Sequence, residues 1–255
     1  MLLIYTTLLK AIYRARFGEP PDLSSGQECH GLVLVADGVG GLDLCGTGLR
    51  YVIGAMKIPY IVKVVSWGHG FGRWHADLTN AANRDLRARE IAHAVVAFRR
   101  AHPAAATFLV GKSGGTGLIV KALEHLDADA VETAVLLSPA LSPTYDLIRA
   151  LSAVRREMVV FWSPLDVIVL GVGTRIFGTI DRIKTISAGM VGFRPPDPDP
   201  GAADRDAAYR KLCQVRWRPQ MAATGYLGGH VGPDNPAFLR KYVVPLLRVG
   251  EPENR

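Results

Sequence analysis

The chain has 255 residues, of which 49% are hydrophobic and 21% charged, and this composition favours one folded domain with a sizeable core. Its 30 lysine and arginine residues exceed the 23 acidic residues, which gives a formal net charge of +7. The basic residues are scattered and form no stripe interleaved with aromatic residues, so we expect a solvated basic surface and no nucleic-acid partner. The three cysteines form no Cys-x-x-Cys pair, which argues against a disulfide framework or zinc knuckle and fits a cytoplasmic location.

Residues 1–16 begin with an apolar run and continue with Lys10, Arg14 and Arg16. The run lacks the basic leader and cleavage site of a signal peptide, and it is too short to span a bilayer. We expect residues 1–22 to form an amphipathic helix docked on the domain. Weak contact of this segment with a membrane interface is the alternative.

From Gly31 onward, short runs of Val, Ile and Leu alternate with longer helical patterns. This alternation predicts an α/β fold, with a mostly parallel sheet covered by helices on both faces. The runs are continuously apolar or β-branched, as in strands buried on both faces. The predicted strands are Leu32–Ala36, Ile61–Trp67, Thr107–Gly111, Ala134–Ser138, Met158–Trp162 and Gln214–Trp217. No internal repeat is present, and the length and apolar content predict a single domain over residues 1–255.

The clearest helical pattern lies at Ala81–Ala101, where Leu86, Ile91, Val95 and Phe98 recur at near-helical spacing. A proline shortly after this range marks its end. Further helices are predicted at Gly117–Leu126 and Asn235–Leu247, and a surface loop at residues 194–201.

A serine stands between glycines in the run Gly111-Lys-Ser113-Gly-Gly115, after a predicted strand and before a predicted helix. A serine hydroxyl is a poor nucleophile at neutral pH, so acyl chemistry needs a sharp turn that brings it to a base and to oxyanion donors. Glycines two positions before and after the serine leave room for such a turn. Chance supplies Gly-x-Ser-x-Gly in about one chain in ten of this composition, so the flanking strand and helix carry much of the prediction.

The string Gly-Lys-Ser also occurs in phosphate-binding loops, which need a further glycine five positions before Gly111. Ala106 stands at that position. We therefore reject the nucleotide-binding hypothesis, and Lys112 is interpreted as the variable residue of the serine turn.

With this turn the chain resembles the α/β-hydrolase superfamily of serine esterases and lipases, in which an acid and a histidine follow the serine in chain order. The turn Ser163-Pro-Leu-Asp166, just after a predicted strand, resembles the acid-bearing turn of the family. Gly228-Gly-His230, before the terminal helix, resembles its histidine loop. The resemblance implies that Ser113 is the nucleophile, Asp166 the acid and His230 the base. A helix N-cap is a second role open to Asp166, and the two roles are compatible.

Two other residues remain as alternatives for the catalytic roles. His69 lies in Trp67-Gly-His-Gly, which resembles a glycine-rich turn beside the site whose histidine is usually structural in the family. Asp146, after the strand that ends at Ser138, is a reserve candidate for the acid.

The run Asp37-Gly-Val39-Gly-Gly41 stands where the family commonly has His-Gly and takes an oxyanion donor from the next backbone amide. The resemblance implies that the amides of Val39 and Gly114 are the two donors. Asp37 departs from the usual histidine, which leaves the local hydrogen bonding of this loop open. A glycine-rich turn without a catalytic role is the alternative.

The resemblance implies hydrolysis of a small-molecule carboxylic ester through an acyl-enzyme on Ser113, without a metal or cofactor. Only about twenty residues separate the strands that end near Ser138 and begin near Met158, which excludes a large lid domain. Residues 67–75 and 167–193 are the loops expected near the site. A thioesterase, lipase or acyltransferase with the same residues stays open, as does a non-catalytic ligand-binding protein of this fold. The oligomeric state is not predicted.

Overall fold

The computed structural model describes residues 29–70, 72–197 and 203–249. The helix expected at residues 1–22, and with it the predicted membrane contact, lies outside the described residues, as does part of the predicted loop at 194–201. In the described ranges, no helix combines the length and the apolar character that crossing a membrane requires.

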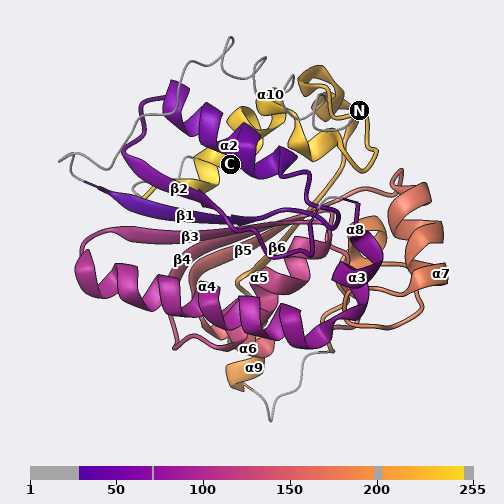
Figure 1. Cartoon of the computed structure of the whole chain (residues 1–255), viewed down its shortest axis with the longest axis horizontal. Coiled ribbons are helices and arrows are strands. Elements are labelled where there is room, and N and C mark those ends of the chain that lie inside the picture. The colour runs from indigo at the N-terminus through magenta and orange to yellow at the C-terminus, as the bar shows by residue number, and fades with distance from the viewer. Residues whose placement is uncertain (1–28, 71, 198–202, 250–255) are drawn as a thin grey trace.

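The core of the fold is a six-stranded sheet with the order β2-β1-β3-β4-β5-β6 (Figure 1). The strands are β1 (Gly31–Ala36), β2 (Tyr60–Val64), β3 (Ala106–Lys112), β4 (Val131–Leu137), β5 (Val154–Trp162) and β6 (Leu212–Arg216). Every neighbouring pair is parallel, so the carboxyl ends of all strands lie at one edge of the sheet. This confirms the predicted α/β class.

Helices cover both faces of the sheet because successive strand residues point to opposite sides. Along β1, Leu32 and Leu34 pack into one buried cluster, and Val33 and Val35 pack into the other. On the first face lie α4 (Ala81–Ala101), α5 (Gly114–Glu124) and α6 (Ile148–Ser152); on the second lie α2 (Leu44–Ala55) and α10 (Pro236–Phe238) (Figure 1). α9 (Ala203–Tyr209) precedes β6.

Several element ends differ from the sequence prediction. The strand predicted at Ile61–Trp67 starts at Tyr60 and ends at Val64. Trp67 lies beyond it, and its indole donates a hydrogen bond to the Asp37 carbonyl at 2.8 Å. The helix predicted from Gly117 starts at Gly114, immediately after the serine. Helix α4 has the predicted bounds, although Leu86 is exposed and does not belong to its buried face.

The single helix predicted at Asn235–Leu247 is divided into three short pieces. They are α10, a π-helical turn at Leu239–Val243 (η4) and a 3-10 turn at Val244–Leu247 (η5). Pro245 lacks an amide hydrogen and its ring crowds the carbonyl four residues earlier, which an α-helix does not tolerate in its interior. The apolar residues of this stretch still pack on the sheet as expected.

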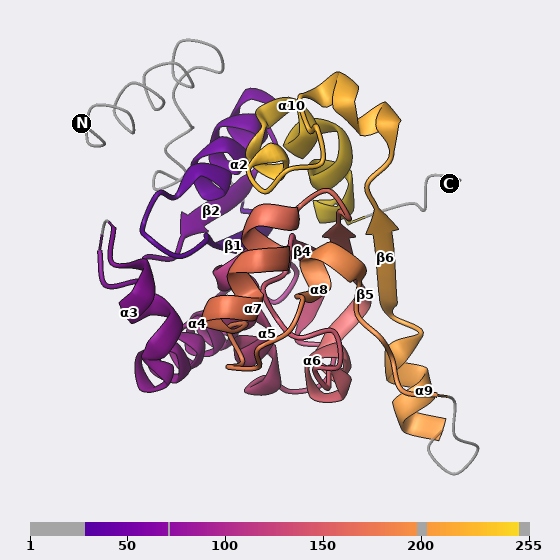
Figure 2. The same ribbon diagram turned by 90° about the vertical axis from the view of Figure 1, so that its right-hand side faces the viewer.

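Short helices and turns gather at the carboxyl edge of the sheet, which Figure 2 shows face on. They are α3 (Trp74–Thr79), the π-helical η1 (Val167–Gly173), α7 (Thr174–Phe177), α8 (Ala188–Val191) and the 3-10 turns η2 (Pro219–Thr224) and η3 (Gly232–Asp234). Between β4 and β5 the only helix is α6, so the expectation that no large lid domain is present is confirmed.

Candidate active site

Ser113 occupies a strained turn between β3 and α5. Its φ of 52° and ψ of −124° are rarely adopted by a residue other than glycine, and such strain is typical of functional sites. The turn is held by neighbours: the Ser113 amide donates to the Leu137 carbonyl at 2.9 Å, and the Ser113 carbonyl accepts from the amide and hydroxyl of Thr116 at 3.0 and 2.5 Å. The surrounding structure therefore fixes the direction of the serine side chain.

The two glycines of the motif are needed because other backbone lies against them. A Cβ atom on Gly111 would lie 2.7 Å from the Cα of Thr116. A Cβ atom on Gly115 would lie 2.1 Å from the Ala36 carbonyl oxygen and 2.4 Å from that of Asp37. No side chain fits at these distances, so both positions require glycine for close packing of β1, β3 and α5.

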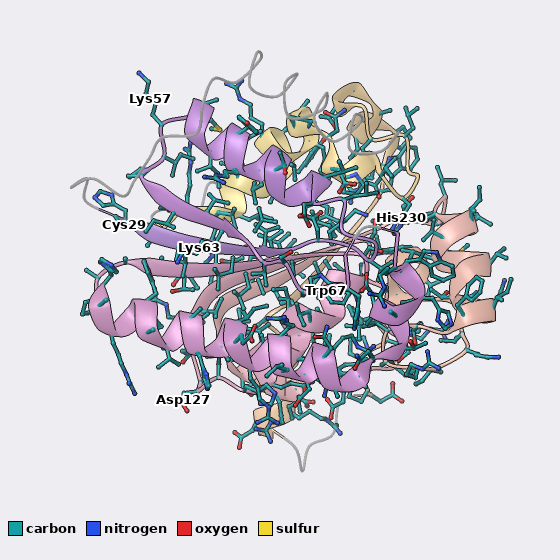
Figure 3. All side chains as sticks on the ribbon, viewed as in Figure 1. Cys29, Lys57, Lys63, Trp67, Asp127 and His230 are labelled. Atoms are coloured by element: carbon teal, nitrogen blue, oxygen red, sulfur yellow. The ribbon has the colours of Figure 1, made fainter. Side chains whose placement is uncertain are left out.

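The structure brings Ser113, Asp166 and His230 together at the carboxyl edge of the sheet, where Figure 3 labels His230. His230 Nε2 lies 2.9 Å from Ser113 Oγ, and His230 Nδ1 lies 2.7 Å from Asp166 Oδ2. Asp166 is buried, and the His230 side chain is 18% exposed. A serine hydroxyl, an imidazole and a carboxylate thus form one hydrogen-bonded chain.

The turns that carry the acid and the histidine support each other. The amide of Ser163, just after β5, donates to the Gly189 carbonyl at 2.9 Å and anchors the start of the acid turn. A Cβ atom on Gly228 would meet the side chain of Leu165 at 2.7 Å, so the histidine loop lies directly against that turn. Asp166 also stands at the N-cap position of η1, but its side chain makes no capping hydrogen bond there.

The loop after β1 lies beside the serine. A Cβ atom on Gly38 would lie 3.2 Å from Cβ of Ser113, and one on Gly114 would lie 3.6 Å from the Val39 amide nitrogen. Gly114 is the first residue of α5, where amide hydrogens have no partner within the helix. Within the part of the chain that the structure describes, the Val39 amide donates to no protein acceptor. Both amides are therefore placed to bind an anion next to Ser113.

His69 is not brought to the serine; it is bound to Asp77, a buried residue that the sequence analysis did not identify. The His69 backbone amide and Nδ1 lie 2.7 and 2.9 Å from Asp77 Oδ1, and His69 Nε2 lies 3.1 Å from Nδ2 of the Asn80 side chain. The other oxygen of Asp77 accepts from the Gly40 amide at 2.8 Å. The pair thus braces the loop that carries Val39. Asp146, the reserve acid, accepts hydrogen bonds from the Ile148 amide and the Tyr209 hydroxyl instead.

The structure shows which hydrogen bonds are made by Asp37, which stands where the family commonly has histidine. Its carboxylate accepts from the amides of Cys45 at 2.9 Å and Gly46 at 2.7 Å, so it binds the N-terminal turn of α2. Burial, together with the negative charge of Asp234, raises the pKa of Asp37 to about 7. The carboxyl group therefore holds the start of the loop after β1 against α2.

Lys112 is buried beneath the site, although the sequence suggested only a variable position. Its Nζ lies 4.0 Å from Oδ1 of Asp234, which follows His230 in the same loop. Burial, and then the positive charge of Lys112, lower the pKa of His230, against the opposing effect of Asp166. Asp37, Cys45 and Asp234 also converge within 4.8 Å, as metal ligands can, but the ammonium beside them already supplies a cation to this cluster.

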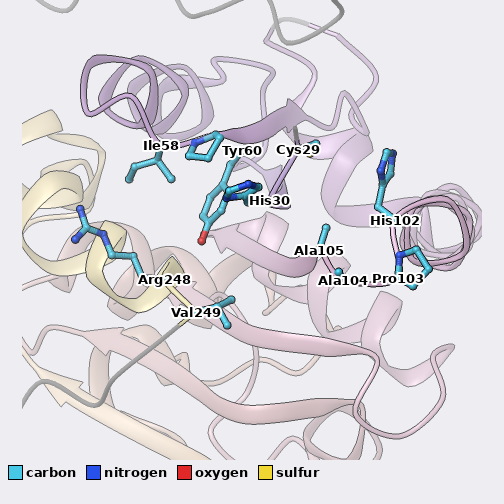
Figure 4. A pocket seen from close by; sticks show the side chains of 11 residues that line it. Cys29, His30, Ile58, Tyr60, His102, Pro103, Ala104, Ala105, Arg248 and Val249 are labelled. Atoms are coloured by element: carbon cyan, nitrogen blue, oxygen red, sulfur yellow. The ribbon is translucent and has the colours of Figure 1, made fainter. Parts of the chain in front are cut away.

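A separate hollow of about 570 Å³ lies at the opposite, amino-terminal end of the strands (Figure 4). It is lined by residues that precede β1, β2 and β3, among them His30, Pro59 and Ala105, and by Arg248 and Val249. Cys29 and Val249 adjoin residues outside the described ranges. None of the residues brought together around Ser113 lines this hollow, so it has no part in that chemistry.

The parallel sheet, with a strained serine turn after β3, has the α/β-hydrolase fold that the sequence suggested.

No family model and no curated protein matches the sequence. Among solved structures, the chain is similar to a predicted CIB-like hydrolase from Thermoplasma acidophilum, with 17% identity, a TM-score of 0.46 and coverage of 87% of this chain and 88% of that one. It is also similar to a cutinase-like protein from Cryptococcus sp. (15%, TM-score 0.45, coverage 88% and 98%). A third similar structure is LpqC, a poly(3-hydroxybutyrate) depolymerase from Bordetella parapertussis (15%, TM-score 0.46, coverage 88% and 84%). Similarity at these levels carries no argument about activity, so function is inferred from the site itself.

Proposed function

We propose that the protein is a serine hydrolase that cleaves carboxylic esters through an acyl-enzyme on Ser113. The observation that carries this proposal is the pair of hydrogen bonds made by His230, one to Ser113 Oγ and one to Asp166. An imidazole held between a carboxylate and a serine hydroxyl can take the serine proton during attack on a carbonyl carbon. A non-catalytic ligand-binding protein has no need for this arrangement.

In the proposed mechanism, His230 accepts the Ser113 proton as Oγ bonds to the ester carbonyl carbon. The amides of Val39 and Gly114 donate hydrogen bonds to the oxygen that becomes negative. His230 then gives its proton to the departing alcohol oxygen, which leaves the acyl group on Ser113. A water molecule, deprotonated by His230, attacks the acyl carbon, and the returning proton restores the serine and releases the acid.

The electrostatic surroundings suit this base. Because burial and Lys112 lower the pKa of His230, the imidazole is neutral at neutral pH and can accept a proton. Asp166 holds the ring by Nδ1, so that Nε2 faces the serine, and its negative charge stabilises the imidazolium that forms during attack.

Covalent labelling with a fluorophosphonate, together with turnover of nitrophenyl esters and thioesters of increasing chain length, tests the proposal. The wild type should label and hydrolyse esters, and Ser113→Ala should do neither. Ser152→Ala is the matched control, because this exposed hydroxyl only caps a helical turn through the Ile148 carbonyl. A wild type that neither labels nor turns over an ester contradicts the enzyme proposal, and labelling of Ser113→Ala assigns the nucleophile elsewhere.

A further inference from the structure

Large apolar side chains are exposed around the carboxyl edge of the sheet. The most exposed are Ile168 at 83%, Leu227 at 72% and Val231 at 69%. The others near this edge are Trp74, Leu165, Val167, Val169, Val172, Ile176, Phe177 and Ile183. Within the described ranges, only Leu86 and Val249 are large exposed apolar residues outside these segments. Such concentration on one side of a molecule marks a binding surface.

This apolar surface surrounds the residues of the candidate site. Leu165 and Val167 flank Asp166 in the chain, and Val231 follows His230. In the loop after β1, a Cβ atom on Gly40 would lie 3.9 Å from Cβ of Trp74. The ring of Trp74 in turn meets that of Phe177 edge to face, with centroids 5.1 Å apart. α3 and α7, which carry these two rings, both lie on the face shown in Figure 2.

An ordinary surface helix exposes polar residues. The helical turn η1 exposes apolar residues instead. Leu170 points inward and is buried, and Gly171 lies against Met190, so the turn is anchored on one side. Ile168 and Val172 point outward into solvent. An anchored helix with an apolar outer face presents that face to something other than water.

The exposed charged side chains of segment 165–184 are all positive. Arg175, Arg182 and Lys184 are exposed in the same segment, 165–184. Its two carboxylates are engaged inside the fold: Asp166 binds His230, and Asp181 accepts from the amide and hydroxyl of Ser142 at 2.9 and 2.5 Å. An apolar surface with exposed cations complements an anionic lipid surface, into which apolar side chains insert while Arg and Lys meet the headgroups.

We infer that residues 165–184, together with Trp74, Leu227 and Val231, dock on an anionic lipid–water interface. The site then faces the lipid, and its substrate is an ester with a long acyl chain held in that interface. This assignment of substrate rests on the proposed function, whereas docking itself does not. An acyl chain then passes from the lipid to Ser113 along this apolar surface and stays in an apolar environment.

Docking is tested by sedimentation of full-length Ser113→Ala with two kinds of vesicle, phosphatidylcholine alone and an equal mixture with phosphatidylserine. The protein should bind the mixed vesicles more tightly, and added salt should weaken this binding. Ile168→Glu, in the same background, should reduce binding at least tenfold. Leu86→Glu is the matched control and should bind as its parent does, because Leu86 is exposed on α4 and is not among the residues inferred to dock. Residues 1–28 are the same in every variant.

Equal vesicle binding by Ile168→Glu and its parent, or no binding by the parent, overturns the docking inference. The inference is also overturned if the parent is a dimer in gel filtration, Ile168→Glu is a monomer and neither binds vesicles, because the surface is then an interface between copies of the chain.

Turnover separates docking from the proposed chemistry. In the wild-type background, Ile168→Glu should keep its rate on a short, soluble nitrophenyl ester and lose at least tenfold on nitrophenyl palmitate embedded in the mixed vesicles. Vesicle binding without turnover of either ester contradicts the proposed function alone. Turnover of the soluble ester without vesicle binding contradicts docking alone. An equal rate of Ile168→Glu and wild type on the embedded ester contradicts the substrate assignment.

Discussion

Replacing Gly115 by alanine tests whether close packing of the serine turn positions the candidate site. The added Cβ atom would lie 2.1 Å from the Ala36 carbonyl oxygen and 2.4 Å from that of Asp37, and both are backbone atoms. The serine turn and the loop after β1 must therefore separate by about 1 Å. Such a displacement typically costs ~10²-fold in rate. Overpacking of this kind also destabilises a fold by about 1–3 kcal/mol. We expect kcat/KM on a nitrophenyl ester to fall at least this far, with a lower Tm.

Gly229→Ala is the matched control. Gly229 is next to His230, but a Cβ atom there meets no atom within 4 Å. This variant should keep the wild-type Tm and a rate within about threefold of wild type. Fluorophosphonate labelling of both variants reports whether the serine remains reactive. Wild-type kinetics in Gly115→Ala would refute the packing argument, and equal losses in both variants would show that the rate does not depend on this contact.

Three further predictions concern the charges of the site. Asp166→Asn should reduce kcat by about 10⁴-fold without global unfolding, measured by ester kinetics and circular dichroism, because the imidazole loses its orienting carboxylate; a loss under tenfold would contradict its role. Since only the neutral imidazole is a base, and burial and Lys112 lower the pKa of His230, activity should persist below pH 6.5 and fall as pH drops through the lowered pKa. Lys112→Met should move this acid limb to higher pH, and an unmoved limb would count against the electrostatic coupling. The pKa of Asp37 is raised from 3.8 to about 7, so the stability that its protonated form provides is complete below pH 3.8 and is lost as pH rises through 7. The loss in free energy of unfolding caused by Asp37→Asn, measured by urea unfolding, should therefore shrink by about 4 kcal/mol between pH ~4 and ~8. A loss that does not change with pH would contradict the raised pKa of Asp37.

The sequence indicated the sheet and the serine turn because both depend on local chemistry. Continuous apolar runs that alternate with helical patterns are typical of buried parallel strands. Gly111 and Gly115 mark a turn that tolerates no side chain. Helix α4 was predicted with its correct ends because its apolar period is long and a proline follows it. The C-terminal stretch is helical over nearly the predicted range, but its helix type changes along the chain, and Pro245 lies in the last, 3-10 piece.

The resemblance to the α/β-hydrolase family implied three site residues, but only the tertiary structure decided what each side chain contacts. His69 and His230 both lie in glycine-rich loops, so their local sequences do not distinguish them. In the structure His69 binds Asp77, whereas His230 lies between Asp166 and Ser113. These contacts join residues from separate loops, so they depend on how parallel strands bring those loops to one edge. Burial of Lys112 and the gathering of exposed apolar side chains around the site are also properties of that edge. The amino-acid sequence by itself determined the strands and the serine turn, whereas the packing of distant loops decided the partners, charges and surroundings of the serine.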